Sequence, residues 1–249
     1  MAVRSEISRA LAHALDRSEI TAWFQPQIDL VTHRVVAVEA LCRWTHPDWG
    51  PVGPNEFIPI AEEDGMIGEI GRYMATQAIA VMSRWGIDVS VNVSPTQLQD
   101  SAFSTWLGRL VDRISHPARR LTLEITEGRR IGNVSAVVGR LDRLRAMGLG
   151  IALDDFGAGQ ASLTQLKRLH ATELKIDRAL VADESPSAER TMGAAITVAH
   201  DAGIRVVAEG IETTRHLEKA TSLGCDRGQG YLFARPMPRR QLDALLTAL

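Results

Sequence analysis

The stretch TAWFQPQIDLVTHRVVAVEALCRW, residues 21–44, decides how the sheet of this protein is arranged. It contains two apolar runs, residues 21–30 and 35–44, with the length and residue types of β-strands. Only residues 31–34 separate the two runs, whereas a connection between parallel strands needs about a dozen residues or more. We therefore expect the first two strands to form an antiparallel hairpin.

Six further strand candidates follow this hairpin, and helical segments separate them. The candidates are VSVNVS (89–94), LTLEITE (121–127), IALDDF (151–156), ELKID (173–177), RVVAEG (205–210) and GQGYLF (228–233). Helices are expected over residues 1–20, 57–85, 103–114, 134–147, 162–169, 189–202, 214–223 and 238–249. This alternation is typical of an α/β fold with a largely parallel sheet. It predicts a TIM-like (β/α)8 barrel with one antiparallel strand, the first strand being paired as a hairpin with the second.

The composition is that of an ordinary soluble protein and excludes several classes of function. Of the 249 residues, 45% are hydrophobic and 23% are charged, and the formal net charge is -2. Nucleic-acid polymers select strongly basic faces, so we expect no such partner. No apolar run approaches the roughly 18 residues of a membrane span, and the N-terminal segment is too polar for a signal peptide. Two cysteines without CxxC spacing favour a reducing compartment. We expect a single cytoplasmic domain over residues 1–249.

Six strands place an ionisable or amide side chain late in an apolar run. These residues are Glu39, Asn92, Glu124, Asp154, Lys175 and Glu209. A strand can simply become polar where it reaches the surface, and this interpretation suffices for any one position. In a barrel, however, active sites collect at the carboxyl ends of the strands. Carboxylate and amide oxygens are also the ligands that Mg2+ and Mn2+ prefer, so the six residues together favour a metal site.

The adjacent residues Asp154 and Asp155 impose a condition on the fifth strand. Successive side chains of a strand point to opposite faces of the sheet, so both aspartates cannot face the barrel mouth in a regular strand. The following Phe-Gly-Ala-Gly sequence permits other backbone conformations. Both carboxylates can reach the mouth only if the chain leaves strand geometry at this point.

In chain order, these residues and their neighbours match one known pattern. The matching segments are Glu39-Ala40-Leu41, VNVS with Asn92, LEITE with Glu124, DDFG with Asp154, LKID with Lys175, VAEGIET with Glu209 and QGYLFARPM with Gln229. This ordered set resembles the EAL domain family of cyclic di-GMP phosphodiesterases, over about residues 11–249. The resemblance implies a TIM-like barrel with an antiparallel strand, which agrees with the hairpin expected above.

The resemblance also implies an activity and a metal centre. Active members of the family hydrolyse cyclic di-GMP to linear pGpG with two Mg2+ or Mn2+ ions in the active site. The metal ligands implied for this chain are Glu39, Asn92, Glu124, Asp154, Asp155, Asp177 and Glu209, with Asp154 bridging the two ions. The implied catalytic residues are Glu39, Lys175, which would orient the attacking water, and Glu209, as general base or metal ligand.

Other family positions are matched by residues that would contact the substrate or support the site. The implied substrate contacts are Gln25, Leu41, Arg43 and Gln229. Thr126 and Glu127 resemble residues that stabilise the loop after the paired aspartates. Family members often pair through the face that carries this loop, so a homodimer is a further expectation.

The loop after the paired aspartates departs from the family pattern. It reads DDFGAGQASL where the family usually has DDFGTGYSSL, so Ala158, Gln160 and Ala161 replace Thr, Tyr and Ser. Drift in a surface loop would explain the change without consequence. Alternatively, loss of a hydroxyl removes an anchor of Asp155, and the domain then acts as a weakly active or inactive receptor or interaction module for cyclic di-GMP.

The loop hypothesis has a direct test. If the altered loop limits turnover, the double substitution Ala158→Thr and Gln160→Tyr should raise the rate of cyclic di-GMP hydrolysis, because it restores a hydrogen-bonding anchor beside Asp155. The rate is measured as pGpG formed at saturating Mn2+. An unchanged rate in the double variant would contradict the loop explanation.

Overall fold

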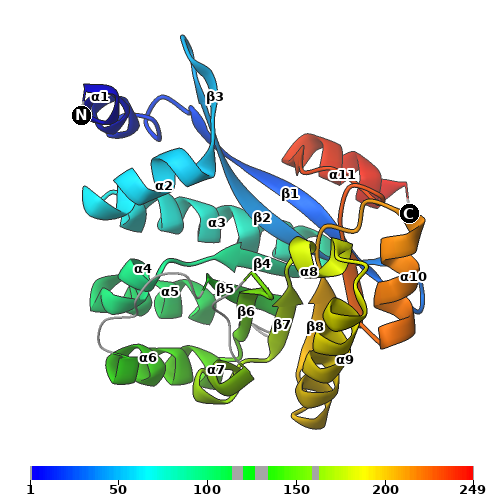
Figure 1. Cartoon of the computed structure of the whole chain (residues 1–249). Helices are drawn as coiled ribbons and strands as arrows, with labels where there is room; N and C mark the ends of the chain where they lie inside the picture. Colours follow the sequence, from blue (N-terminus) through cyan, green and yellow to red (C-terminus); the bar gives the residue numbers. More distant parts are fainter. Residues whose placement is uncertain (1, 114–119, 127–133, 159–162, 249) are drawn as a thin grey trace.

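The computed structural model describes residues 2–113, 120–126, 134–158 and 163–248, and eight of its strands close into a barrel (Figure 1). These strands are β1 (Ile20–Asp29), β2 (Val35–His46), β4 (Asp88–Asn92), β5 (Leu121–Thr126), β6 (Gly150–Phe156), β7 (Glu173–Ile176), β8 (Arg205–Ala208) and β9 (Arg227–Gln229). Around the barrel the order is β1, β9, β8, β7, β6, β5, β4 and β2, and pairing of β1 with β2 closes the ring.

One strand of the barrel is reversed. β1 pairs antiparallel with both β2 and β9, whereas the other neighbouring strands of the ring are parallel. Between β1 and β2 the chain turns within residues 30–34. The predicted fold class, a TIM-like barrel whose first strand forms a hairpin with the second, is confirmed.

Helices cover the outside of the barrel (Figure 1). They are α1 (Ala2–Leu11), α2 (Pro54–Glu63), α3 (Ile67–Trp85), α4 (Pro95–Gln99), α5 (Ser101–Asp112), α6 (Val134–Ala146), α7 (Leu163–Arg168), α8 (Arg178–Ala182), α9 (Pro186–Asp201), α10 (Thr214–Leu223) and α11 (Arg239–Thr247). In the part of the chain that the structure places, none of the helices combines the length and the hydropathy that crossing a bilayer requires.

The alternation of strand side chains divides the core into two layers. Leu123, Leu153 and Leu174 are fully buried, and each directly precedes a polar residue of the same strand. Because successive side chains face opposite sides of the sheet, these leucines pack beneath the helices while the polar residues point into the barrel. The polar groups are therefore held in the interior by strands whose other face is anchored in an apolar layer.

The structure differs from the sequence expectations at several elements. Residues 57–85 form two helices, because the chain turns between them at Gly65, whose φ of +77° does not occur in a right-handed helix. The segment 228–233 is a strand only as far as Gln229. A Cβ at Gly230 would lie 2.1 Å from the backbone oxygen of Ile211. The backbone of Ile211, in the loop after β8, therefore packs directly against Gly230. The short strands β3 (Gly50–Val52) and β10 (Met237–Pro238) were not expected.

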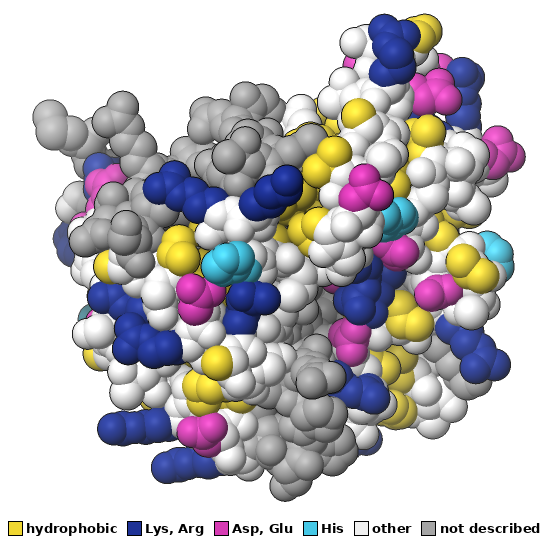
Figure 2. Space-filling model, turned by 90° about the horizontal axis from the view of Figure 1, so that it is seen from below, with side chains coloured by type: hydrophobic (Ala, Val, Ile, Leu, Met, Phe, Trp, Pro, Cys, Tyr) yellow, Lys and Arg dark blue, Asp and Glu magenta, His cyan; other side chains and the backbone are white. Residues whose placement is uncertain are grey.

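The face of the molecule seen from below in Figure 2 carries charges of both signs. On the face in Figure 2, Lys and Arg side chains lie interspersed with Asp and Glu side chains among the coloured residues. This distribution agrees with the formal net charge of -2.

The C-terminal helix α11 is attached to α3 through Asp243. Its carboxylate accepts a hydrogen bond from Trp85 Nε1 at 2.6 Å and lies 3.6 Å from Arg84 Nε. The neighbouring Leu242 is fully buried. Since Trp85 ends the 19-residue α3, this attachment lies at the opposite end of that helix from Ile67, about 27 Å away at 1.5 Å per residue.

Removal of the Asp243 carboxylate should weaken the fold without reaching the barrel mouth. Asp243→Ala leaves the half-buried Trp85 N–H without its acceptor and should cost about 1–3 kcal/mol. For a domain of this size, each kcal/mol lowers Tm by about 2–4 °C, which calorimetry would record. Mn2+ affinity should be the same as in the wild type. A Tm equal to that of the wild type would contradict the stabilising role of the hydrogen bond between Trp85 and Asp243.

Candidate active site

Lys175 lies at the centre of the barrel mouth and contacts carboxylates from four other strands or strand ends. Its side chain is 1% exposed, and its Nζ lies 2.7 Å from Glu209 Oε1, 2.8 Å from Glu124 Oε2, 3.3 Å from Asp154 Oδ1 and 3.5 Å from Glu39 Oε2. These carboxylates come from β2, β5, β6 and the residue that follows β8. One ammonium group therefore joins strand ends that are far apart in the sequence.

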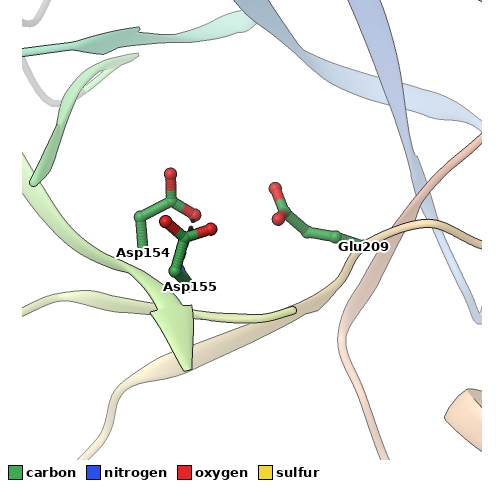
Figure 3. A group of neighbouring side chains, drawn as sticks. All are labelled: Asp154, Asp155 and Glu209. Atoms are coloured by element: carbon green, nitrogen blue, oxygen red, sulfur yellow. Dashed lines mark hydrogen bonds between the residues drawn. The ribbon is translucent and has the colours of Figure 1, made fainter. Parts of the chain in front are cut away.

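Strand β6 is interrupted where its two aspartates occur. The register of β6 against β7 shifts after Leu153, and two residues of β6 then oppose the single Lys175. Asp155 adopts a φ of +60°, and its backbone N–H donates to Asp154 Oδ1 at 3.0 Å. This bulge turns both carboxylates the same way (Figure 3). The expectation that the chain leaves strand geometry at this point is confirmed.

Asp154, Asp155 and Glu209 form a group that could bind a metal ion. One carboxylate oxygen of each residue lies within 4.8 Å of the others. Figure 3 shows the carboxylates of the two aspartates on the side that faces the carboxylate of Glu209. A divalent cation with oxygen ligands at about 2.0–2.6 Å could lie between such oxygens after small side-chain movements.

Glu124 provides a second sign that the mouth suits cations. Its Oε2 contacts Lys175, whereas its Oε1 is buried and has no hydrogen-bond partner within the described structure. A buried acceptor without a partner is costly, and a bound cation would remove that cost. The mouth also contains more carboxylates than its single lysine can neutralise. The residues present therefore fit a site for divalent cations.

Burial, together with neighbouring negative charge, shifts the pKa values of three carboxyl groups upward. Burial, and then the charge of Glu39, raises the pKa of Glu124 well above its ordinary value. Burial raises the pKa of Glu209 to about 8 despite the attraction of Lys175. Burial followed by the charges of Asp154 and Asp177 raises the pKa of Asp155 to about 6. At pH values below these pKa values, the carboxyl groups hold protons that a divalent cation would displace.

Two groups depart from this trend because of close partners. Burial would raise the pKa of Glu39, but the charge of Lys175 and a hydrogen bond from Gln229 hold it below its ordinary value. Burial would lower the pKa of Lys175, yet the carboxylates around it, Asp154 first, raise it well above its ordinary value. Glu39 is thus ionised and Lys175 is charged.

Side-chain amides connect the carboxylates. Asn92 Nδ2 donates to Glu39 Oε1 at 2.9 Å and to Glu124 Oε2 at 3.2 Å, which leaves its Oδ1 as the atom that could bind a cation. Gln229 Nε2 donates to Glu39 Oε2 at 2.6 Å and to Gln25 Oε1 at 3.0 Å. Glu39 therefore has amide donors on both of its oxygens.

Two cavities open on either side of this cluster. One, of about 240 Å³, is lined by Gln25, Gln229, Asp177 and neighbouring residues. The other, of about 660 Å³, is lined by Arg43, Asn92, Asp155 and the start of α2, among others. Glu39, Leu41 and Asp154 line both cavities. The carboxylate cluster thus lies at the junction of a two-part groove.

The EAL domain family model matches residues 8–236 of the chain. The chain belongs to the EAL domain family. Among curated proteins, cyclic di-GMP phosphodiesterase PA2567 of Pseudomonas aeruginosa is 40% identical over 227 residues, which cover 88% of this chain and 39% of that protein. The bifunctional diguanylate cyclase/cyclic di-GMP phosphodiesterase MucR of the same organism is 36% identical over 242 residues, covering 94% of this chain and 35% of that protein.

A solved structure extends the likeness to the fold. The PaMucR phosphodiesterase in its c-di-GMP complex has a TM-score of 0.87 and 35% identity, covering 95% of this chain and 99% of that chain. This EAL domain therefore matches the whole of that solved chain but spans only 39% and 35% of the length of the two curated relatives. The family and its barrel fold are established, and the recognition from the ordered motifs is confirmed.

The residues expected from the EAL motifs lie at this one end of the barrel, apart from Thr126 and Glu127. Asp177 borders the smaller cavity, and one of its oxygens accepts from Ala179 N–H at 2.8 Å at the start of α8. The Arg43 guanidinium donates to Cys42 O at 2.9 Å and borders the larger cavity. Thr126 ends β5, but its side chain is outside the description. Glu127, like Gln160 of the altered loop, lies outside the described residues.

Three further residues at this EAL site were not expected from the motifs. Arg178 and Tyr231 line the smaller cavity. Arg178 directly follows the LKID segment, and Tyr231 lies two residues after Gln229. Gln27 is 1% exposed and donates to Gln229 Oε1 at 3.0 Å. It lies two residues after Gln25 in the same strand, so the period of two could have indicated that both face the barrel interior.

The raised pKa values predict that metal binding depends on pH. Carboxyl groups must lose their protons to bind a cation, so Mn2+ affinity should rise as pH passes through about 6 for Asp155 and about 8 for Glu209. In the metal-free protein the stability of the fold changes in the opposite direction to the Mn2+ affinity, because a carboxyl with a raised pKa stabilises the fold only while it keeps its proton. Stability should therefore fall as pH rises from the ordinary pKa values of these groups, 3.8 for Asp155 and 4.5 for Glu209, to their raised values of about 6 and about 8.

Tm measurements without metal between about pH 4 and about pH 8.5, and calorimetric titrations with Mn2+ between about pH 5.5 and about pH 8.5, test both effects. An Mn2+ affinity that stays constant over this interval would contradict the account.

Proposed function

We propose that this EAL domain is a metal-dependent phosphodiesterase that hydrolyses cyclic di-GMP to linear pGpG. The observation that carries the proposal is the cluster of carboxylates around Lys175 at the mouth of an EAL barrel, at the junction of two cavities. The relatives named above as cyclic di-GMP phosphodiesterases support the substrate and the reaction.

The proposed cofactor is a pair of Mg2+ or Mn2+ ions. One ion would be bound by Glu39, Asn92, Glu124 and Asp154, and the other by Asp154, Asp155, Asp177 and Glu209. The bulge in β6 supports this division, because it presents two adjacent carboxylates where a regular strand would present one. When bound, such a pair lowers the pKa of a water molecule and neutralises the charge that develops on the attacking and leaving oxygens.

The residues of the chain would orient the water and accept its proton. In hydrolysis to pGpG, a water oxygen bonds to one phosphorus, the bond from that phosphorus to the ribose O3′ breaks, and O3′ takes up a proton. Lys175 would hold the water and stabilise negative charge on the phosphate. Glu209, whose Oε1 lies 2.7 Å from Lys175 Nζ, would accept the proton of the water or bind the second ion.

The two-part groove suits a cyclic dinucleotide. Such a ligand has two nucleotide arms joined by two phosphates, so one arm could enter each cavity while a phosphate lies over the carboxylate cluster. Arg43 in the larger cavity and Gln25 and Gln229 in the smaller one are the proposed phosphate and guanine contacts. Leu41, which lines both cavities, would separate the two arms.

Activity measured with a matched pair of variants tests this function. Purified protein with Mg2+ or Mn2+ should convert cyclic di-GMP to pGpG, identified by chromatography and mass spectrometry. Glu39→Ala should reduce turnover by at least about 10³-fold, because it removes a proposed ligand and the partner of Lys175. Asp243→Ala, at the far end of α3, should retain turnover while lowering Tm.

The receptor function is the alternative that this experiment separates. Ala158, two residues after Phe156 in the altered loop, is the feature that favours it. Tight, metal-independent binding of cyclic di-GMP without product formation would overturn the hydrolase proposal and support a receptor or interaction module.

A further inference from the structure

Three glutamine side chains form a buried chain of hydrogen bonds beneath the barrel mouth. Gln27 Nε2 donates to Gln229 Oε1 at 3.0 Å, and Gln229 Nε2 donates to Gln25 Oε1 at 3.0 Å and to Glu39 Oε2 at 2.6 Å. Gln27 is 1% exposed, Gln229 4% and Gln25 7%. The chain of bonds therefore ends on a carboxylate of the candidate metal site.

The reversed strand β1 brings these groups together. Its register places Gln25 opposite Glu39 of β2 and Gln27 opposite Gln229 of β9. Gln27 also pairs with Ala37, two residues before Glu39 in β2. Since β2 runs toward the mouth, Gln27 lies one layer deeper in the barrel than Gln25.

The chemistry of Glu39 fixes the direction of the bonds. An ionised carboxylate only accepts hydrogen bonds, so the Gln229 atom facing Glu39 must be Nε2. The carboxamide oxygen of Gln229 then points away from Glu39, into the barrel, where it needs a donor. Gln27 Nε2 is that donor.

We propose that Gln27 is a positioning residue that holds the Gln229 carboxamide with its Nε2 toward Glu39, and thereby fixes the Glu39 carboxylate for a divalent cation. Among the described residues that line the two cavities, Gln25 and Gln229 are present and Gln27 is not. Gln27 therefore acts on the site through Gln229 and not by touching the substrate. The kinetic part rests on the proposed hydrolysis, and the metal-binding part does not.

The effect should appear as a loss of Mn2+ affinity that depends on Gln229. Removal of a hydrogen-bond partner of a metal ligand typically lowers metal affinity by about 10–100-fold. Gln27→Met and Gln229→Met should therefore each weaken Mn2+ binding by about tenfold or more. The double variant should bind Mn2+ no more weakly than Gln229→Met alone, because Gln27 acts only through Gln229. Calorimetry or Mn2+ electron paramagnetic resonance gives the affinities.

A third variant tests the orientation of the Gln229 carboxamide. In Gln27→Glu, at a pH high enough to ionise the new carboxyl, an acceptor faces Gln229 Oε1, so the carboxamide should turn over and present its oxygen to Glu39. Mn2+ affinity should therefore fall further than in Gln27→Met. Should Gln27→Met not fold, Gln27→Asn carries the same expectation as Gln27→Met, since it withdraws the amide by one methylene.

Kinetics and a stability control complete the test. If the wild type hydrolyses cyclic di-GMP, Gln27→Met should lower kcat at limiting Mn2+ and leave KM for cyclic di-GMP nearly unchanged. Asp243→Ala lowers Tm by a different route and should leave Mn2+ affinity intact. Equal losses of affinity for Gln27→Met in the wild-type and Gln229→Met backgrounds, or no loss in either, would overturn the proposal. A wild type that binds Mn2+ without turnover would instead overturn the hydrolase function alone.

Discussion

The burial of a charged lysine among carboxylates is the interaction on which the rest of this structure depends. Lys175 is 1% exposed, and an ammonium in such a place is tolerated only when opposite charges surround it. Glu39, Glu124, Asp154 and Glu209 provide those charges from four directions around the barrel. In doing so they gather more negative charge than one lysine balances. Protonation of carboxyl groups or binding of cations can reduce this excess of negative charge. In the metal-free protein, burial raises the pKa values of Glu124 and Glu209 and so favours their protonation.

The reversed strand gives this barrel an asymmetric mouth. Five of the parallel strands or their ends bring ionisable groups to it and two bring the amides Asn92 and Gln229, whereas β1 brings the amides Gln25 and Gln27. An amide can donate to a carboxylate without adding charge, so this side of the mouth orients Glu39 and leaves the charge balance to the other strands. The same side opens into the smaller cavity. The reversed direction of β1 thus determines which side chains reach this side of the mouth.

The sequence predicted the elements that depend on local rules. A four-residue link forces the hairpin, and the paired aspartates force a departure from strand geometry, which is the bulge with Asp155 at a φ of +60°. Features that depend on contacts between distant segments were not predictable. The segment 228–233 leaves the sheet at Gly230 because the backbone of Ile211 lies against it. Gln27 was missed because its role depends on Gln229, which is 202 residues away in the chain.

We propose that the excess of negative charge at the mouth is balanced by two divalent cations that share Asp154. Anomalous diffraction from crystals soaked in Mn2+ tests it most directly, since it locates the ions without reference to turnover. The account predicts two peaks about 3.5–4 Å apart, one beside Glu39 and Glu124 and one beside Asp155 and Glu209, with Asp154 between them. Peaks confined to the protein surface, or no peak at the mouth at saturating Mn2+, would contradict it.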